Sequence, residues 1–262
     1  MISYELKVEK EVKNIIDSIR KYFVKNGTKD TKAIIGISGG KDSTIAAALL
    51  VRALGPERVI GVLMPNGVQD DIKDAYEVCH MLNIKFYEIN IAGPCQAIYN
   101  AIQCGYPGYD GLIGDNKKIN TNTPSRVRMT TLYAIAAMEH GRVINTGNAS
   151  ERYVGYTTKY GDLAGDFALF TQYYVRDVVA IGDYLELPRH LVHKEPSDGM
   201  SGKTDADNMG FTYEVLDNYL IDGIVPDVDT LKNIEDRHSR NEHKDNVQIP
   251  CCVPVSRWSV LF

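Results

Sequence analysis

The sequence predicts an α/β fold in which a doubly wound parallel sheet is flanked by helices. Up to Thr146, short apolar segments alternate with segments of helical periodicity. Each expected strand is apolar throughout rather than alternating, which is typical of parallel strands buried on both faces. A chain of 262 residues, 44% of them hydrophobic, can build one large core. We therefore expect a single domain over residues 1–262.

The first half of the chain supplies the sheet. An apolar stripe at helical spacing predicts an opening helix over Val8–Lys25. The expected strands are Ala33–Ile37, Arg58–Met64, Ile84–Ile91 and Arg142–Thr146. The expected helices between them are an alanine-rich segment ending near Gly55, then Gln69–Asn83, Pro94–Gln103 and Thr123–His140.

Polar segments interrupt this pattern. Gly105–Asn122 is rich in Gly, Asp and Asn, and we expect a loop there. Two further loops are expected at Tyr160–Asp166 and Glu195–Asn208, and long loops in a compact domain are usually functional. The last expected elements are helices over Tyr213–Leu220 and Val228–Glu242.

Composition excludes several classes of function. The formal net charge of −5 indicates no general basic surface for nucleic acid. No apolar run is long enough to span a membrane, and we expect no membrane partner. The five cysteines show no CxxC spacing, which argues against zinc or redox chemistry. The odd cysteine count without a signal peptide predicts a cytoplasmic location.

The segment SGGKDS, Ser38–Ser43, lies between the first expected strand and its helix. A glycine turn there directs backbone N–H groups and the positive end of a helix toward one point, which suits a phosphate. The Walker pattern fails because Lys41 stands where its second glycine should be. Asp42 would repel a phosphate unless a cation lies between them. The segment therefore predicts a metal ion as well as a phosphate.

Ligands of parallel sheets bind beyond the carboxyl ends of the strands. The segments expected there are Ser38–Ser43, Met64–Asp71 and Thr146–Asp166, which are also rich in Gly, Asp, Asn and Thr. We expect the chemistry at this edge.

SGGKDS resembles the SGGxDS loop of the ATP-pyrophosphatase enzymes. The remaining chain is similar to ammonia-dependent NAD synthetases in MPNGVQDDIKDA, NTPSRVRMTTLYAIA, NTGNASE, YTTKYGDLAGD, GFTYEVLDNYL and NEHKDNVQIP. The resemblance implies an adenine nucleotide alpha hydrolase-like fold and a homodimer. It also implies conversion of deamido-NAD, ATP and ammonia into NAD, AMP and pyrophosphate with Mg²⁺.

The same resemblance implies roles for individual residues. The catalytic set is Asp42, Glu151, Lys159 and Asp166, and Asp42 and Glu151 would hold Mg²⁺. The residues implied to bind ATP are Gly36, Ile37, Ser38, Gly39, Gly40, Lys41, Asp42, Ser43, Thr146, Arg176 and Ser197. Those implied to bind deamido-NAD are Arg126, Lys159, Asp166, His243 and Lys244. Asp162 is a candidate for positioning ammonia.

Several points stay open at this stage. Lys41 either neutralises phosphate or points to solvent, and Arg128 fits a solvated position on an amphipathic helix. A helix N-terminus at Asn148–Ser150 is compatible with a metal role for Glu151. Where many relatives carry an ATP-contacting lysine, this chain has Val175, so that either the contact is missing or Arg176 replaces it.

Other departures affect single contacts of the ATP loop. Ser197 keeps the hydroxyl of a threonine found in relatives, and Ala206 replaces a carboxylate. With a helix expected from Val8, we expect no glutaminase domain and external ammonia as the nitrogen source, while a partner glutaminase stays open. The rival functions are a tRNA-thiolating or GMP-forming relative and a nucleotide-binding module without turnover. A thiolating enzyme usually relies on paired cysteines and a basic surface, and this chain has neither. A binding module without turnover is expected to lack the metal carboxylates, whereas Asp42 and Glu151 are both present.

Overall fold

The structure is a computed structural model that describes residues 6–69, 71–106, 116–196 and 203–244. Its centre is a parallel five-stranded sheet in the order β3-β2-β1-β4-β5. The strands are β1 (Lys32–Gly36), β2 (Val59–Leu63), β3 (Lys85–Glu88), β4 (Gly141–Asn145) and β5 (Phe167–Ala168). The predicted fold class is confirmed. The strand order reverses direction between β1 and β4, so a crevice is expected at their carboxyl ends.

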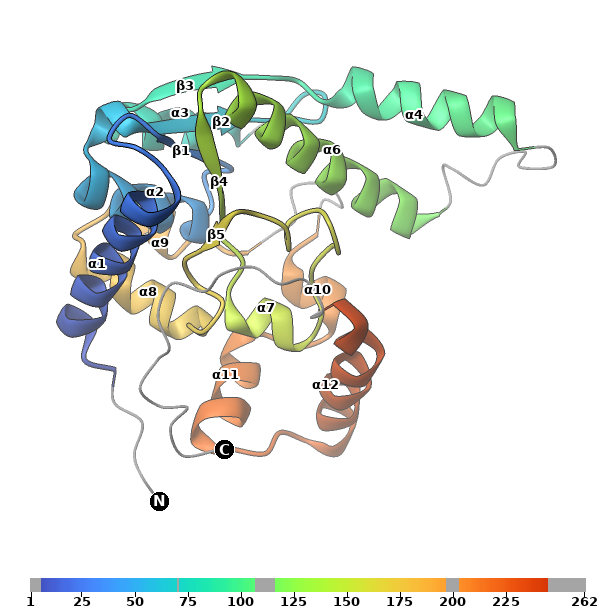
Figure 1. The fold of residues 1–262 in the computed structure, drawn as a ribbon. Helices are drawn as coiled ribbons and strands as arrows, with labels where there is room; N and C mark the ends of the chain where they lie inside the picture. Colours follow the sequence, from blue (N-terminus) through green and yellow to red (C-terminus); the bar gives the residue numbers. More distant parts are fainter. Residues whose placement is uncertain (1–5, 70, 107–115, 197–202, 245–262) are drawn as a thin grey trace.

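Helices cover both faces of the sheet (Figure 1). One face carries α1 (Val8–Asn26), α2 (Lys41–Leu54), α3 (Ile72–Met81), α8 (Val175–Tyr184) and α9 (Arg189–Val192). The other face carries α4 (Ala92–Gly105) and α6 (Lys117–Met138). Successive residues of β1 divide between the two cores: Ala33 and Ile35 pack toward α2, and Ile34 packs toward α6. This explains why the strands are apolar throughout.

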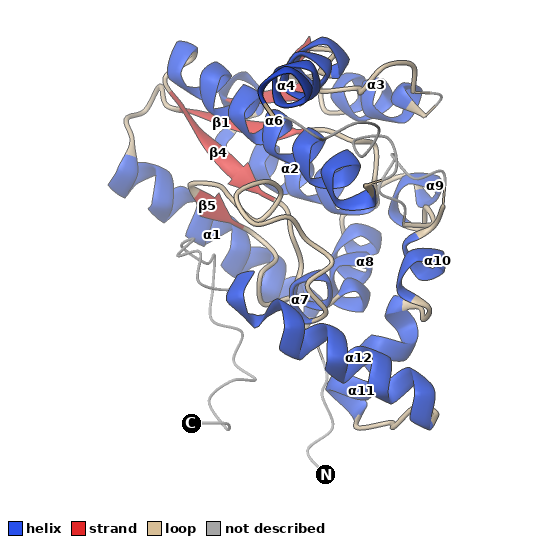
Figure 2. Ribbon diagram, turned by 90° about the vertical axis from the view of Figure 1, so that its right-hand side faces the viewer, coloured by secondary structure: helices blue, strands red, loops and turns tan. Residues whose placement is uncertain are grey.

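A third apolar cluster lies away from the sheet. It is built from Val154, Met209, Phe211, Tyr213, Leu216 and Ile234. The cluster joins α7 (Ala149–Tyr153), α10 (Asp205–Met209), α11 (Tyr213–Asp222) and α12 (Val228–Asn241). Figure 2 shows α11 and α12 below the strands, beyond α7. The two remaining elements are short 3₁₀ turns, η1 (Pro56–Arg58) and η2 (Glu242–Lys244).

Some predicted elements were wrong in extent. The loop expected at Gly105–Asn122 is too long, because α6 begins at Lys117, where the Asn116 side chain accepts hydrogen bonds from the backbone of Lys118 and Ile119. The strand expected over Ile84–Ile91 shortens to β3, a partly exposed edge strand.

The later half holds short elements that the sequence did not indicate. Thr204–Met209 is not loop, because Thr204 and Asp207 form a capping box for α10. The two-residue strand β5 escaped prediction because its length carries no periodicity. Residues 197–202 of the expected loop lie outside the described residues. In the part of the chain that the structure describes, no helix is both long and apolar enough to span a membrane.

Candidate active site

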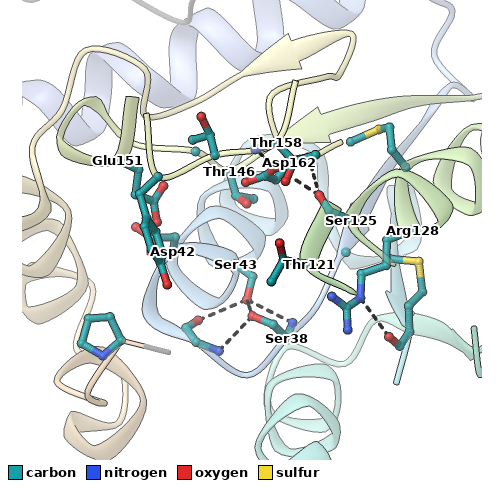
Figure 3. Close-up of a pocket in the computed structure, with 18 of the residues that line it drawn as sticks. Ser38, Asp42, Ser43, Thr121, Ser125, Arg128, Thr146, Glu151, Thr158 and Asp162 are labelled. Carbon is teal, nitrogen blue, oxygen red and sulfur yellow. Dashed lines mark hydrogen bonds between the residues drawn. The ribbon is translucent and has the colours of Figure 1, made fainter. Parts of the chain in front are cut away.

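A cavity of about 770 Å³ opens at the carboxyl ends of β1, β2 and β4. Its walls come from the β1–α2 loop, the start of α3, the first half of α6 and the segment from Thr146 to Ala164. Residues of α10 and α12 close it from the side of the third apolar cluster. Figure 3 shows polar side chains from these segments, among them Asp42, Glu151 and Asp162, around the cavity. The predicted location of the chemistry is thus where the sheet places a crevice.

The SGGKDS segment forms a tight loop at the N-terminus of α2. Gly39 has a φ of 78°, and a Cβ added to it would lie 2.7 Å from the Cβ of Asp74, so only glycine fits. The hydroxyls of Ser38 and Ser43 lie 3.1 Å apart, and the Ser38 hydroxyl accepts the Gly40 N–H at 3.2 Å. The first turn of α2 therefore presents backbone N–H groups and two hydroxyls to the cavity, as an anion requires.

Asp42 and Glu151 approach each other from α2 and α7, and Asn148 connects them. Its amide nitrogen donates to Asp42 at 3.2 Å, and its backbone N–H donates to Glu151 at 3.1 Å. Its side-chain oxygen accepts the Glu151 N–H at 3.0 Å, which completes a capping box for α7. The structure therefore contains both the helix N-terminus at Asn148 and the pair of carboxylates Asp42 and Glu151.

The carboxylates of Asp42 and Glu151 repel each other when both are ionised. Burial, followed by repulsion from Asp42, raises the pKa of Glu151 to about 8. A divalent cation between the two groups would relieve this repulsion, so the donor set fits Mg²⁺. No group of three His, Cys, Asp or Glu side chains in the described ranges could hold a metal ion. The protein would thus supply two carboxylates, and substrate phosphates and water would supply the remaining ligands.

Lys41 does not point to solvent, which settles one open alternative. The residue is 5% exposed, and its ammonium lies 3.0 Å from Asp42 and 5.6 Å from the centre of the Tyr213 ring. Burial acts to lower the pKa of Lys41, but the nearby carboxylates outweigh burial and raise it. The ammonium therefore stays charged within the cavity.

Asp162 lies on the opposite wall, near Ser125 and Thr158 (Figure 3). Its carboxylate accepts hydrogen bonds from the Ser125 hydroxyl at 3.0 Å and the Thr158 N–H at 2.6 Å. Desolvation by the cavity wall raises the pKa of Asp162 despite these bonds, although the residue stays exposed at the wall. The side chain is a fixed acceptor on the cavity wall, compatible with its candidate role toward ammonia.

The residues expected to bind deamido-NAD fall into separate places. Lys244 lines the cavity, where its ammonium donates to two backbone carbonyls at 2.7 Å. Arg126 and Lys159 are on the exterior, where Arg126 donates to the Lys159 carbonyl and Lys159 donates to the His243 carbonyl. Asp166 lies at the start of β5 and accepts the Val143 N–H at 2.8 Å. Of these five residues, only Lys244 lines the same cavity as the SGGKDS loop.

Two predicted ATP contacts outside the SGGKDS loop, Thr146 and Arg176, differ in their position. Thr146 lines the cavity beside Gly147. Arg176 does not line it in the described structure, because its guanidinium makes two hydrogen bonds with Asp222, one of them 3.1 Å long. Its replacement of the lysine absent at Val175 stays a prediction that this geometry does not support. Ser197 lies outside the described residues.

Sequence reasoning missed four cationic residues of the cavity wall, Lys118 of α6 and three others. Arg128 was expected on a solvated face, which is wrong: its guanidinium reaches the cavity and donates to the Met64 carbonyl at 3.1 Å. Lys194 bridges Asp71 and Asp74 at 2.9 and 2.7 Å, and Arg237 comes from α12. A signal existed for Arg128, because the wall residues of α6 follow helical spacing: Thr121, Ser125, Arg128, Met129 and Leu132.

Comparison with known proteins identifies the family of this chain. The family model described as NAD synthase matches residues 11–248. The chain belongs to this NAD synthase family. An NH(3)-dependent NAD(+) synthetase of Alkaliphilus metalliredigens is 35% identical over 91% of this chain and 96% of its own length.

Solved structures of the family share the fold. An NMN synthetase from Francisella tularensis superposes with a TM-score of 0.82 at 31% identity, covering 95% of this chain and 99% of its own. An NH3-dependent NAD synthetase from Campylobacter jejuni, in complex with the nitrate ion, gives 0.71 at 27% identity, covering 93% and 98%.

Proposed function

We propose that this member of the NAD synthase family adenylates the nicotinate carboxylate of deamido-NAD and then replaces AMP with ammonia. The family has NH3-dependent NAD synthetase activity, which converts deamido-NAD to NAD. One observation carries the assignment of the site: the SGGKDS loop and the Asp42–Glu151 pair face the same cavity at the point where the strand order reverses.

In the first step an oxygen of the nicotinate carboxylate attacks the α-phosphorus of ATP, and the bond to the bridging oxygen of the β-phosphate breaks. The backbone N–H groups of the loop and the Ser38 and Ser43 hydroxyls stabilise the leaving pyrophosphate. Asp42 and Glu151 would hold Mg²⁺, which neutralises charge on the phosphates when bound. The protein contributes mainly position and electrostatics.

In the second step ammonia attacks the carbonyl carbon of the acyl-adenylate, and AMP leaves. Ammonium must first lose a proton before its nitrogen can attack. The Asp162 carboxylate, whose position is fixed by Ser125 and Thr158, is the proposed group that binds the ammonium ion. The raised pKa of Asp162, caused by desolvation, suits a group that takes up a proton during the step.

A homodimer is the proposed assembly. The helices α4 and α6 project to one side of the molecule (Figure 1). Exposed apolar side chains on them include Ile98, Ile102, Tyr133 and Met138, the last 74% exposed. A second copy would cover this surface and extend the site toward Arg126 and Lys159, which a single chain leaves on the exterior.

The proposed compartment is the cytoplasm. Among the described residues, Cys79, Cys95 and Cys104 are free thiols, and Cys79 and Cys95 are buried. Burial raises the pKa of both buried thiols, to about 12 for Cys79, so they are unreactive. Free thiols fit a reducing environment.

Nicotinate mononucleotide is a second candidate substrate. The Francisella tularensis structure is titled an NMN synthetase, and only Lys244 of the predicted dinucleotide contacts lines the cavity with the ATP loop. A substrate without the AMP half needs fewer contacts at the exterior. The chemistry of the reacting carboxylate is the same for both substrates.

Product analysis tests both assignments. The protein is mixed with ATP, Mg²⁺ and ammonium plus either deamido-NAD or nicotinate mononucleotide, and NAD, NMN and AMP are quantified. We expect NAD and AMP in equal amounts, with a higher kcat/KM for deamido-NAD. A higher kcat/KM for the mononucleotide establishes the second candidate, and AMP without an amidated product contradicts both. A parallel reaction with glutamine in place of ammonium tests the nitrogen source.

A further inference from the structure

Lys41 is a buried lysine inside a site that binds a cation in the proposed function. It is 5% exposed, although lysine is almost never fully buried without a partner. Its position is fixed by the first turn of α2, directly before Asp42. The side chain turns back into the cavity rather than along the helix surface, and its ammonium lies 3.0 Å from the neighbouring carboxylate.

Three carboxylates line the same cavity as this ammonium. Asp42, Glu151 and Asp205 each interact electrostatically with it. They come from α2, α7 and α10, three segments far apart in the sequence. Asp205 is itself 6% exposed and accepts a hydrogen bond from the Tyr213 hydroxyl at 3.2 Å.

The ring of Tyr213 also lies close to the Lys41 ammonium. Its centre lies 5.6 Å from the Lys41 ammonium, within the range of a cation–π contact. Tyr213 also belongs to the third apolar cluster, so the ammonium connects the ATP loop with the C-terminal helices. A neutral side chain at position 41 would leave these carboxylates without this nearby positive charge.

When both metal carboxylates are ionised, as the binding of a divalent cation requires, three carboxylates and one ammonium have a net charge of −2. One divalent cation balances that charge, whereas a site without the lysine would carry an additional negative charge. We propose that the Lys41 ammonium is a built-in counter-cation: it holds Asp42, Glu151 and Asp205 together before ligands arrive and weakens the binding of a free divalent cation. The metal then enters with the phosphates of ATP, which supply the further negative ligands. This role rests on the proposed function.

The test measures metal binding and stability without any nucleotide. Lys41→Met removes the charge and keeps the length of the side chain. We expect Mn²⁺, titrated by the loss of the free-ion EPR signal, to bind about tenfold more tightly to this variant than to the wild type, because one nearby repulsive cation is gone. In EDTA the variant is expected to melt at a lower temperature, and added Mn²⁺ is expected to raise its melting temperature more than that of the wild type.

Two further variants separate charge from packing. Lys41→Met combined with Asp205→Asn restores the net charge to −2, and both Mn²⁺ affinity and melting temperature are expected to return toward wild type. The matched control is Lys85→Met, which removes an exposed lysine paired with Glu139 at 2.8 Å outside the cavity. We expect it to leave Mn²⁺ binding unchanged. If Lys41→Met can be isolated only with Mn²⁺ present, that supports the proposal, and Lys41→Gln replaces it in the titration.

A Mn²⁺ affinity of Lys41→Met within about twofold of wild type overturns the counter-cation role. So does a double variant as unstable as the single one, since packing rather than charge would then explain the loss. These measurements contain neither ATP nor a nicotinate substrate. Their failure is therefore distinguishable from the failure of the proposed reaction, which product analysis decides.

Discussion

At the scale of one residue, the ionised Glu151 carboxylate lowers the stability of the folded protein. Its carboxylate lies beside Asp42 in a buried setting, which raises its pKa from an ordinary 4.5 to about 8. A carboxyl whose pKa is raised on folding binds its proton more tightly in the folded state. Its neutral form therefore stabilises the fold fully below about pH 4.5, and this contribution is lost as the pH rises to about 8.

Glu151→Gln is expected to separate turnover from stability. Glutamine resembles the neutral carboxyl, so in EDTA at pH 8.5 the variant should melt above the wild type, and at pH 4.5 the two should converge. Turnover should fall about 100-fold or more, because a weakened metal site loses several kcal/mol of charge stabilisation. Melting curves across pH and steady-state rates across a Mg²⁺ titration measure both effects.

Asp42→Asn is the companion variant, with the same expected loss of turnover and a smaller effect on stability. Near-wild-type rates at ordinary Mg²⁺ in both variants would remove the metal assignment. A wild-type melting temperature that does not change between pH 4.5 and 8.5 would contradict the raised pKa of Glu151.

Among the elements, α7 is short but sets the geometry of the site. It has five residues, and its N-cap residue, Asn148, is fully buried. The hydroxyl of Ser150 donates to the buried Asp217 carboxylate of α11 at 2.5 Å and accepts the Val175 N–H at 3.0 Å. A helix this short is stabilised by its caps and tertiary contacts rather than by propensity. Its neighbours α8 and α11 thus determine where Glu151 points.

Asn148→Ala tests this element. The change removes the N-cap of α7 and the bond to Asp42, and we expect a loss of about 1–2 kcal/mol in the free energy of unfolding. The apparent Mg²⁺ requirement should rise, because neither carboxylate is then held in place. Urea unfolding and Mg²⁺ titrations of the rate measure the two effects.

The matched control is Asn116→Ala, which removes the N-cap of α6 outside the cavity. It is expected to lower stability by a similar amount and to leave the Mg²⁺ requirement unchanged. An equal rise in the Mg²⁺ requirement for both variants would show that Asn148 acts only through general stability.

On the scale of the whole molecule, three apolar clusters meet around one cavity. Two of them sandwich the sheet, and the third joins α7 with the C-terminal helices. The cavity lies between the sheet and the C-terminal helices, so a ligand bound there would contact both. The surface of α4 and α6 carries exposed apolar side chains, and it is the proposed contact with a second copy.

Met138→Glu places a charge on that surface, and we expect it to shift the protein from dimer to monomer. Sedimentation measures the assembly, and separate titrations measure the two ligands. The monomer is expected to lose affinity for deamido-NAD and to keep affinity for ATP, because the ATP loop lies within one chain. Dilution of the wild type should have the same effect.

Val24→Glu is the control, since Val24 is 83% exposed on α1, away from α4 and α6. It should leave both the assembly and the two affinities unchanged. A monomer of Met138→Glu that binds deamido-NAD at full strength would rule out a site shared between subunits.

The sequence by itself predicted four of the five strands of the sheet and the position of the SGGKDS loop. Continuous apolar segments predict parallel strands wherever helices cover both faces, and the cores on either side of Ile34 and Ile35 have that form. The position of Ser38–Ser43 after such a strand predicts both its anion site and its place at the edge of the sheet. These are local patterns, and local patterns are readable from one chain.

Only the tertiary structure decided how charges meet. The direction of the Lys41 side chain depends on Asp205 and Tyr213, which lie more than 160 residues further along the chain. Arg128 reaches the cavity because β2 ends beside α6, and Arg176 turns away because Asp222 ends α11 nearby. The attraction between two charges depends on their distance and burial in the folded chain, and sequence separation carries neither quantity.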